Sequence, residues 1–244
     1  MDEQKVAELN RIIRECKHIV FFGGAGVSTE SGIPDFRSTD GLYNQTYQYP
    51  PEEIISHSFF EANTEEFYRF YKDRMIYEDA KPNITHLTLA KMEKAGKLKA
   101  VVTQNIDGLH QLAGSENVIE LHGSVLRNYC TRCRKFYPVD YIMKADGVPH
   151  CEKCGAIVKP DVVLYEEGLN EDDLTNAVKA IAEADMLIIG GTSLVVWPAA
   201  GLIRYYNGNR LVLINRDETP YDRKADLVLH ESLGKVFTAI DQSL

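Results

Sequence analysis

Four of the five cysteines stand in two close pairs, which is the arrangement of a metal site. Cys130-x₂-Cys133 and Cys151-x₂-Cys154 are separated by 17 residues, within the range of a zinc ribbon. Each pair presents two thiolates to one ion, so two pairs complete a tetrahedron and leave no position for water. The spacing therefore predicts one structural zinc, with an iron–sulfur centre or unliganded thiols as the alternatives. His150 stands beside the second pair, but four cysteines make it unnecessary as a ligand.

A glycine-rich turn follows a short apolar run near the N-terminus, with the sequence Gly23-Gly24-Ala25-Gly26-Val27-Ser28. A turn of this kind that opens a helix directs backbone N–H groups at a pyrophosphate. Thr29 stands where the usual dinucleotide fingerprint has a third glycine, and no clear second strand ends in an acidic residue about 20 positions later. Taken alone, the turn is equally typical of an ordinary loop.

Polar residues follow three further apolar runs, in the blocks Thr103-Gln104-Asn105-Ile106-Asp107, Leu121-His122-Gly123 and Gly191-Thr192-Ser193. An α/β sheet builds its sites at the carboxyl ends of its strands. An imidazole there, with a reference pKa of about 6.5, can accept a proton at neutral pH. Each residue also has a purely structural interpretation, because Asn and Asp close turns, Ser and Thr cap helices, and a single histidine is often a core residue.

The elements that must position these residues are predicted by apolar patterns. Val6, Leu9 and Ile12 recur at helical spacing and predict an amphipathic first helix. Short runs rich in β-branched residues are nearly continuous in apolar character, which is typical of parallel strands buried on both faces. These runs are residues 19–22, 100–103, 118–121, 162–165, 186–189, 211–214 and 227–229. Because helical patterns lie between several of them, the predicted fold class is α/β with a doubly wound parallel sheet.

The composition fits an ordinary globular protein, with 44% hydrophobic and 26% charged residues. The formal net charge of −9 repels phosphate backbones, so we expect no nucleic-acid partner and a preference for basic protein segments. No run of 18 apolar residues occurs, so no membrane span and no membrane partner are expected. The first residues lack the basic start and apolar stretch of a signal peptide, which predicts a cytoplasmic, reducing location.

Taken in order, these blocks resemble the sirtuins, the Sir2 family of NAD-dependent protein deacylases, in their bacterial form. A further block, Gly32-Ile33-Pro34-Asp35-Phe36-Arg37, adds to the likeness. The resemblance runs from about Ile19 to Asp226 and includes the cysteine pairs between the His-Gly block and the later strands. It implies NAD as a co-substrate, acyl-lysine proteins or peptides as substrates, and one structural zinc ion.

The sequence pattern also indicates how the chain divides. Two stretches interrupt the alternation of strands and helices: one is rich in Tyr and Phe at helical spacing, and the other is polar and holds the cysteine pairs. We expect an NAD-binding, Rossmann-like domain of residues 1–41, 82–127 and 158–244. A helical insertion of residues 42–81 and a zinc ribbon of residues 128–157 would form a smaller lobe.

The NAD-binding residues implied by the resemblance come from all the blocks above and from two later strand ends. Phe36 would cover the nicotinamide ribose, Arg37 would lie near phosphate, and Ile106 and Asp107 would hold the carboxamide. The backbone near Ala225 would edge the adenine. The whole set is Gly24, Ala25, Gly26, Ser28, Thr29, Asp35, Phe36, Arg37, Gln104, Asn105, Ile106, Asp107, His122, Gly191, Thr192, Ser193, Asn215, Arg216 and Ala225.

The catalytic residues implied are His122 and Asn105. The acyl-amide oxygen of the substrate would attack the anomeric carbon as the pyridinium leaves as neutral nicotinamide. His122 would then accept a proton from a ribose hydroxyl, which attacks the imidate carbon and carries the acyl group onto ADP-ribose. Exclusion of solvent from the pocket would keep water from intercepting the sugar cation.

Residues 159–167 resemble the strand on which sirtuins bind the substrate peptide, where an extended peptide can add as another strand. Val163 and Tyr165 would line the acyl-lysine tunnel. The chain departs from the common Phe-Gly-Glu ending, because it reads Tyr165-Glu166-Glu167. The missing glycine affects the expected geometry of the peptide. As an alternative, Val162 to Tyr165 reads as an ordinary core strand.

The acyl group is expected to be neutral. Sirtuins that prefer succinyl or malonyl groups resemble one another in a Tyr-x-x-Arg pair, and here Tyr71 stands where the arginine would be, three residues after Tyr68. Without that cation a carboxylate would be buried unpaired at a substantial cost. Arg69 and Arg74 are the residues that could compensate.

Three other functions remain open from the sequence. A protein ADP-ribosyltransferase would use the same pocket, although the presence of His122 favours deacylation. A zinc-ribbon module that binds nucleic acid is suggested by Arg127, Arg132, Arg134 and Lys135, but four basic residues more often form a solvated face. A dehydrogenase is disfavoured because the glycine fingerprint is incomplete.

Overall fold

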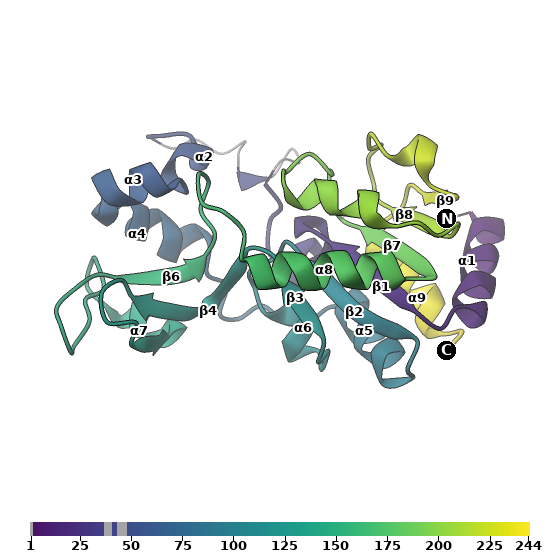
Figure 1. Cartoon of the computed structure of the whole chain (residues 1–244), viewed down its shortest axis with the longest axis horizontal. Helices are drawn as coiled ribbons and strands as arrows, with labels where there is room; N and C mark the ends of the chain where they lie inside the picture. The colour runs from purple at the N-terminus through teal and green to yellow at the C-terminus, as the bar shows by residue number, and fades with distance from the viewer. Residues whose placement is uncertain (1, 37–40, 43–47) are drawn as a thin grey trace.

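The structure is a computed structural model that describes residues 2–36, 41–42 and 48–244 (Figure 1). Its larger part contains a six-stranded sheet in the order β3-β2-β1-β7-β8-β9, and every neighbouring pair is parallel. The chain moves outward from β1 to β2 and β3, then returns to place β7 on the other side of β1. The strands are β1 (Ile19–Gly23), β2 (Leu98–Thr103), β3 (Val118–Glu120), β7 (Met186–Gly190), β8 (Leu211–Ile214) and β9 (Leu227–Leu229).

This sheet confirms the predicted α/β fold class and six of the apolar runs as parallel strands. Every residue of β1 and of β7 is buried, because helices cover both faces of the sheet. The strand order reverses between β1 and β7, so their carboxyl ends form a topological switch point. Open parallel sheets bind their ligands in the crevice at such a point.

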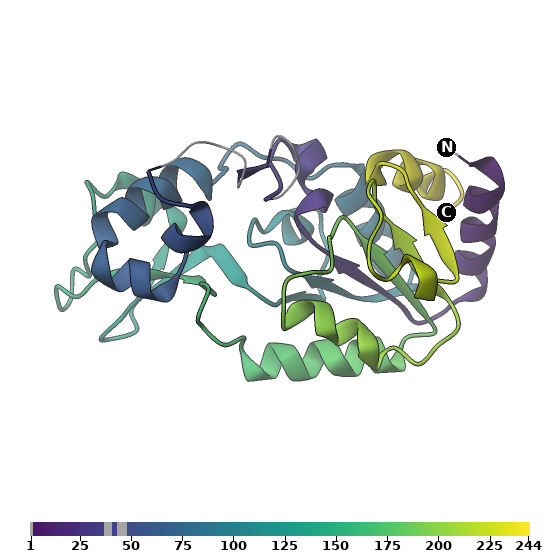
Figure 2. The same ribbon diagram turned by 90° about the horizontal axis from the view of Figure 1, so that it is seen from above.

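Helices pack on each face of the sheet, and each face has its own hydrophobic core (Figure 2). Phe21 of β1 packs in one cluster with residues of α1, α5 and α9, whereas Phe22 packs in the opposite cluster with α8 and η4. The first helix begins as expected, with the Asp2 carboxylate accepting the N–H groups of Gln4 and Lys5. The helices are α1 (Glu3–Glu15), α5 (Ile84–Lys94), α6 (Leu109–Leu112), α8 (Glu171–Glu183), α9 (Leu233–Asp241) and the 3₁₀ segments η4 (Ala199–Tyr205) and η5 (Asp222–Lys224).

A smaller group of elements lies at the end of the molecule away from both termini (Figure 1). It contains an antiparallel sheet in the order β5-β4-β6 and a separate core. That core joins Phe67 and Tyr68 of the helical stretch to Val158 and to two cysteines of the paired set, Cys130 and Cys151. The elements are α2 (Pro51–Ile54), α3 (His57–Ala62), α4 (Thr64–Arg74), β4 (Gly123–Cys130), β5 (Phe136–Pro138), α7 (Val139–Lys144) and β6 (Val158–Val162).

One predicted strand is wrong. The run of residues 162–165 was expected in the parallel sheet, but the strand there is β6, which ends at Val162 and pairs antiparallel with β4. Buried and partly buried residues alternate along β6, so only one face of it meets the core. Of the apolar run, only Val162 belongs to the strand, and residues 163–165 follow it. The proposed division of the chain into domains stays a prediction, and β4 runs through its boundary at residues 127 and 128.

Among the described residues, no helix is both long enough and apolar enough to cross a bilayer.

Candidate active site

A cavity of about 1070 Å³ opens at the carboxyl ends of β1, β2 and β7, between the parallel sheet and the smaller group of elements. Its wall brings together residues from segments far apart in the chain, as the topology predicts. Of the residues expected to bind NAD or substrate, those on the wall are Gly24, Ala25, Gly26, Ser28, Thr29, Asp35, Phe36, Gln104, Asn105, Ile106, Asp107, His122, Val163, Tyr165, Gly191, Thr192, Ser193, Asn215 and Arg216.

Two expected residues are not among them. Ala225 does not line the cavity. Its N–H donates to the Tyr221 oxygen, and its side chain packs against the core on the face of the sheet covered by α8 and η4. The wall near the end of β9 is formed instead by Glu231 and Ser232, which the sequence analysis missed. Nothing in their residue types marks them, since only the meeting of β8 and β9 brings them to the cavity. Arg37 lies outside the described residues.

The glycine turn lies against the end of β7. The Gly26 N–H donates to the Gly191 oxygen over 2.8 Å, and a Cβ on Gly26 would come within 2.8 Å of the Gly191 Cα. This close approach explains why glycine is needed here. The turn was expected to open a helix, and the helical structure that follows it is of the 3₁₀ type. Two short 3₁₀ segments follow it, η1 (Ala25–Val27) and η2 (Thr29–Ser31).

A hydrogen-bonded group of three side chains forms one part of the wall. The Ser28 hydroxyl donates to Asp107 Oδ2 over 2.6 Å and accepts Asn105 Nδ2 over 3.0 Å. The Leu109 N–H donates to Asp107 Oδ1 over 2.9 Å. Burial raises the pKa of Asp107, while the bonds from Ser28 and Leu109 act in the opposite direction. The carboxylate is therefore partly buried, yet it keeps lone pairs for a further donor.

A second link joins the ends of β2 and β7. Gln104 Nε2 donates to the Thr192 hydroxyl over 3.1 Å, and that hydroxyl also accepts the Leu194 N–H over 3.3 Å. Thr192 was expected at the start of a helix, but the next helical segment, η4, begins only at Ala199. The hydroxyl therefore closes a turn and binds Gln104.

His122 stands on the cavity wall between β3 and β4. Its Nδ1 lies 3.0 Å from the Gln104 main-chain oxygen. A carbonyl oxygen only accepts, so Nδ1 carries the proton and Nε2 keeps its lone pair. Burial lowers the pKa of His122, and the bond to Gln104 opposes that effect. The ring is therefore a neutral imidazole near pH 7, with the form required of a general base.

The chain around His122 is held tightly on both sides. Gly123 has a φ of 74°, and a Cβ there would overlap the Asp161 oxygen, so only glycine fits between β4 and β6. The His122 oxygen accepts the Val163 N–H over 3.0 Å. This bond connects the predicted base directly to the segment predicted to bind the substrate.

Tyr165 is bound to the helical part of the smaller group. Its N–H donates to the Ile55 oxygen and its oxygen accepts the His57 N–H, both over 3.0 Å. Both backbone groups of Tyr165 are therefore paired. An added peptide strand would have to use other backbone groups of this segment.

The residues considered for acyl recognition differ in where they lie. Tyr71 is buried, lines the cavity, and its hydroxyl has no hydrogen-bond partner among the described residues. The Tyr68 hydroxyl instead donates to the small-sheet backbone. Arg69 pairs with Glu66 over 2.6 Å and does not line the cavity. Arg74 lines the cavity, and its Nε lies 2.6 Å from the neighbouring carboxylate of Asp73.

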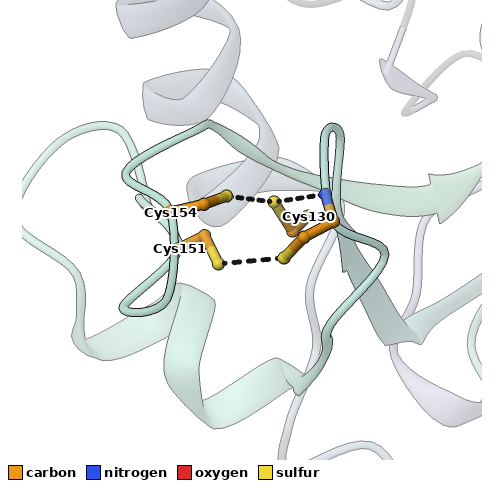
Figure 3. Close-up of side chains that lie close together, drawn as sticks. Cys130, Cys151 and Cys154 are labelled. Carbon is orange, nitrogen blue, oxygen red and sulfur yellow. Dashed lines mark hydrogen bonds between the residues drawn. The ribbon is translucent and has the colours of Figure 1, made fainter.

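The four paired cysteines converge as predicted. Figure 3 shows three of them, Cys130, Cys151 and Cys154, pointing toward one another. All four Sγ atoms lie within 4.8 Å of one another, with Cys130 to Cys154 at 3.3 Å and Cys133 to Cys151 at 3.6 Å. Tetrahedral zinc with bonds of about 2.3 Å requires sulfur separations of about 3.8 Å, so these thiols fit one zinc ion. His150 does not join them, since its Nδ1 lies 3.0 Å from the Gly155 oxygen.

Comparison with known proteins agrees with this geometry. Residues 24–198 match the family model described as the Sir2 family. The NAD-dependent protein deacetylase of Clostridium acetobutylicum is 61% identical over 97% of this chain and 98% of its own length. The protein of the same description from Clostridium tetani is 60% identical over 100% of this chain and 99% of its own.

Solved structures give the same result. A Sir2 protein with a p53 peptide and NAD⁺ is 41% identical, with a TM-score of 0.85, and the match covers 96% of each chain. A Sir2 variant with a deacetylated p53 peptide and 3′-O-acetyl-ADP-ribose is 40% identical, with a TM-score of 0.89 and a coverage of 97% of each chain.

Proposed function

The chain belongs to the Sir2 family, and on that premise we propose that His122 completes the reaction of this NAD-dependent protein deacetylase. The enzyme cleaves nicotinamide from NAD and transfers the acetyl group of acetyl-lysine to ADP-ribose. One water molecule is consumed, and the products are free lysine, nicotinamide and O-acetyl-ADP-ribose. The single observation that carries the proposal for His122 is the position of its imidazole on the cavity wall, with Nδ1 3.0 Å from the Gln104 oxygen.

The role of His122 follows from its tautomer. After nicotinamide has left, a ribose hydroxyl must lose a proton to attack the imidate carbon. Nε2 offers the only unprotonated ring nitrogen, because Nδ1 donates to the Gln104 oxygen. The lowered pKa keeps Nε2 unprotonated at neutral pH and ready to accept a proton.

Asp107 and the backbone of Ile106 are the groups we propose for the nicotinamide carboxamide. A carboxamide carries one acceptor and two N–H donors. The Asp107 carboxylate already accepts from Ser28 and Leu109, and each oxygen keeps a further lone pair for an N–H donor. Its burial makes that hydrogen bond stronger than the same bond in water.

The substrates we propose are proteins or peptides with a neutral acyl-lysine, chiefly acetyl-lysine. Val163 and Tyr165 line the same cavity as His122, and Val163 is hydrogen-bonded to it. The buried Tyr71 hydroxyl supports a small uncharged acyl group, because a succinyl carboxylate beside it would lose its water without gaining a cation. Arg74 on the wall is paired with Asp73.

Two of the four basic residues around the first cysteine pair, Arg127 and Lys135, are paired with carboxylates, which supports this function over nucleic-acid binding. Arg127 lies between two carboxylates, with Glu120 at 2.7 Å and Asp161 at 2.9 Å. Lys135 pairs with Glu152 over 2.8 Å. These three carboxylates offset the positive charge on which phosphate binding depends. The thiol cluster also supports a cytoplasmic location, since a reducing compartment keeps such cysteines free to bind zinc.

The test is turnover of an acetyl-lysine peptide with NAD, followed by mass spectrometry of nicotinamide and O-acetyl-ADP-ribose. We expect His122→Ala to lower the rate of O-acetyl-ADP-ribose formation about 10²–10⁴-fold, the usual contribution of a general base. His18→Ala, at an exposed position away from the cavity, is the matched control. Turnover of His122→Ala at the wild-type rate would refute the proposed role. Labelled ADP-ribose retained on protein would instead indicate a transferase.

A further inference from the structure

Glu166 has a backbone conformation that disfavours a side chain. Its φ is 76°, in the left-handed region that glycine adopts freely and glutamate rarely does. This is the position at which the chain departs from the Phe-Gly-Glu pattern of the family. A residue that costs free energy in its backbone persists where its side chain makes compensating contacts.

The compensating contacts of Glu166 are with Ser58, the second residue of α3. Oε2 accepts the Ser58 N–H over 2.9 Å, and Oε1 accepts the Ser58 hydroxyl over 3.0 Å. Both bonds have a charged acceptor and are therefore stronger than bonds between neutral groups. One side chain thus connects the segment after β6 to the start of a helix more than 100 positions earlier.

The neighbouring residues make the same connection with other groups. The backbone of Tyr165 pairs with Ile55 and His57, and Glu167 Oε1 lies 2.8 Å from His57 Nδ1. Glu167 Oε2 accepts the Leu164 N–H over 2.9 Å. The two carboxylates are therefore held in place by bonds within the protein.

We propose that Glu166 is a positioning residue for the peptide substrate. Its bonds to Ser58 hold the chain beyond Tyr165 in the left-handed turn, and so set the direction of the backbone to which an acyl-lysine peptide adds. This inference rests on the proposed function. Val163, at the other end of the segment, is fixed by His122, so Glu166 controls peptide affinity while the base keeps its position.

Two substitutions separate the side-chain contact from the backbone conformation. Glu166→Asn adopts the left-handed conformation easily, but its side chain is one methylene too short to reach Ser58. Glu166→Gln keeps the length and an acceptor oxygen but has no charge. Ser58→Ala removes the hydroxyl and leaves the backbone N–H. Glu183→Asn, at an exposed position of α8 outside the cavity, is the matched control.

The measurement is steady-state kinetics with an acetyl-lysine peptide and NAD varied in turn. We expect Glu166→Asn to raise the peptide KM about 10-fold, the loss associated with a hydrogen bond to a charged group. Glu166→Gln and Ser58→Ala should raise it less. For all three variants, kcat, the NAD KM and the pH profile should stay within about twofold of wild type, which a general loss of folding would not produce.

The outcomes distinguish this inference from the proposed function. A wild-type enzyme without turnover would contradict the proposed function itself. With an active wild type, an unchanged peptide KM in Glu166→Asn would overturn the positioning role, as would an NAD KM that rises in parallel. If Glu166→Asn folds poorly, Ser58→Ala supplies the same comparison with the glutamate intact.

Discussion

The main-chain oxygen of Gln104 lies 3.0 Å from Nδ1 of His122. The oxygen belongs to the residue directly after β2, and the histidine directly precedes β4. One bond therefore joins the carboxyl end of the parallel sheet to the first strand of the small sheet. It also sets the tautomer of the imidazole, since a carbonyl has no proton to give.

The pH dependence of the reaction should follow His122. Burial lowers its pKa below the usual value of about 6.5, so Nε2 gains its proton only on the acid side of that value. We expect kcat/KM for the peptide to be level between pH 7 and 8. It should fall only on the acid side of 6.5, because protonation removes the base. A profile measured from pH 5 to 8, with circular dichroism at each pH to exclude unfolding, checks this. A midpoint above 6.5 would contradict it.

Ser28→Ala should weaken NAD cleavage more than it weakens the fold. The change removes the donor to Asp107 and the acceptor for Asn105, and it leaves a buried carboxylate with one partner fewer. A bond to a charged group contributes about 1.5–3 kcal/mol, so kcat/KM for NAD should drop about 10–100-fold. Ser31→Ala is the control, because its hydroxyl accepts from Asn83 instead. Equal kinetics for the two variants would argue against a role for this group in NAD binding.

Removing one thiol should release the zinc ion and destabilise the smaller group of elements. Cys130 and Cys151 are both buried in the core that holds Phe67 and Tyr68, so the metal site and that core are one packing unit. We expect one zinc per wild-type chain by mass spectrometry of the metal. Cys130→Ala should contain less than one and melt at a lower temperature, since structural zinc contributes directly to folding. Cys16→Ala, at the remaining cysteine, should keep its zinc. A full zinc content in Cys130→Ala would exclude the four-thiol site.

The central sheet was predictable because each of its strands has a recognisable pattern within a few consecutive residues. Strands covered on both faces need apolar side chains at every position, and β1 and β7 show that pattern directly in the sequence. The zinc site was predictable for a similar reason, because each knuckle needs two cysteines at a fixed spacing. The polar blocks after β2 and β7 follow from the rule that sites form at carboxyl ends of strands.

The predictions that failed, and the residues that were missed, depend on contacts between segments far apart in the sequence. The run after β6 is apolar because Leu164 packs in the smaller core, and an apolar run alone does not tell a strand from a buried loop. Glu231 and Ser232 reach the cavity through the pairing of β8 with β9, whereas Ala225 packs against the core. Glu166 was recognised as a departure, but its bonds to Ser58 appear only once α3 lies beside it.

Acid should destabilise the protein through two buried histidines, His86 and His110, whose ring centroids are 4.7 Å apart. Burial lowers the pKa of His86 to about 4, and burial together with His86 lowers the pKa of His110 to about 3. Both pKa values lie below the unfolded value of about 6.5, so between these limits the unfolded chain binds more protons than the folded one. The free energy of unfolding should therefore have its full value above pH 6.5. Below that pH it should fall by about 1.4 kcal/mol per pH unit for each ring.

His110→Leu tests this directly, because neither ring nitrogen of His110 has a hydrogen-bond partner among the described residues. The variant should be as stable as wild type at pH 7, since no bond is lost. At pH 5 it should keep about 2 kcal/mol of unfolding free energy that wild type loses. This is the loss expected from one imidazole when the pH falls about 1.5 units below 6.5. Urea unfolding at the two pH values measures the difference, with the exposed His18→Leu as the control. An identical loss in wild type and His110→Leu would mean that the acid sensitivity arises elsewhere, because the variant has one buried imidazole fewer to protonate on unfolding.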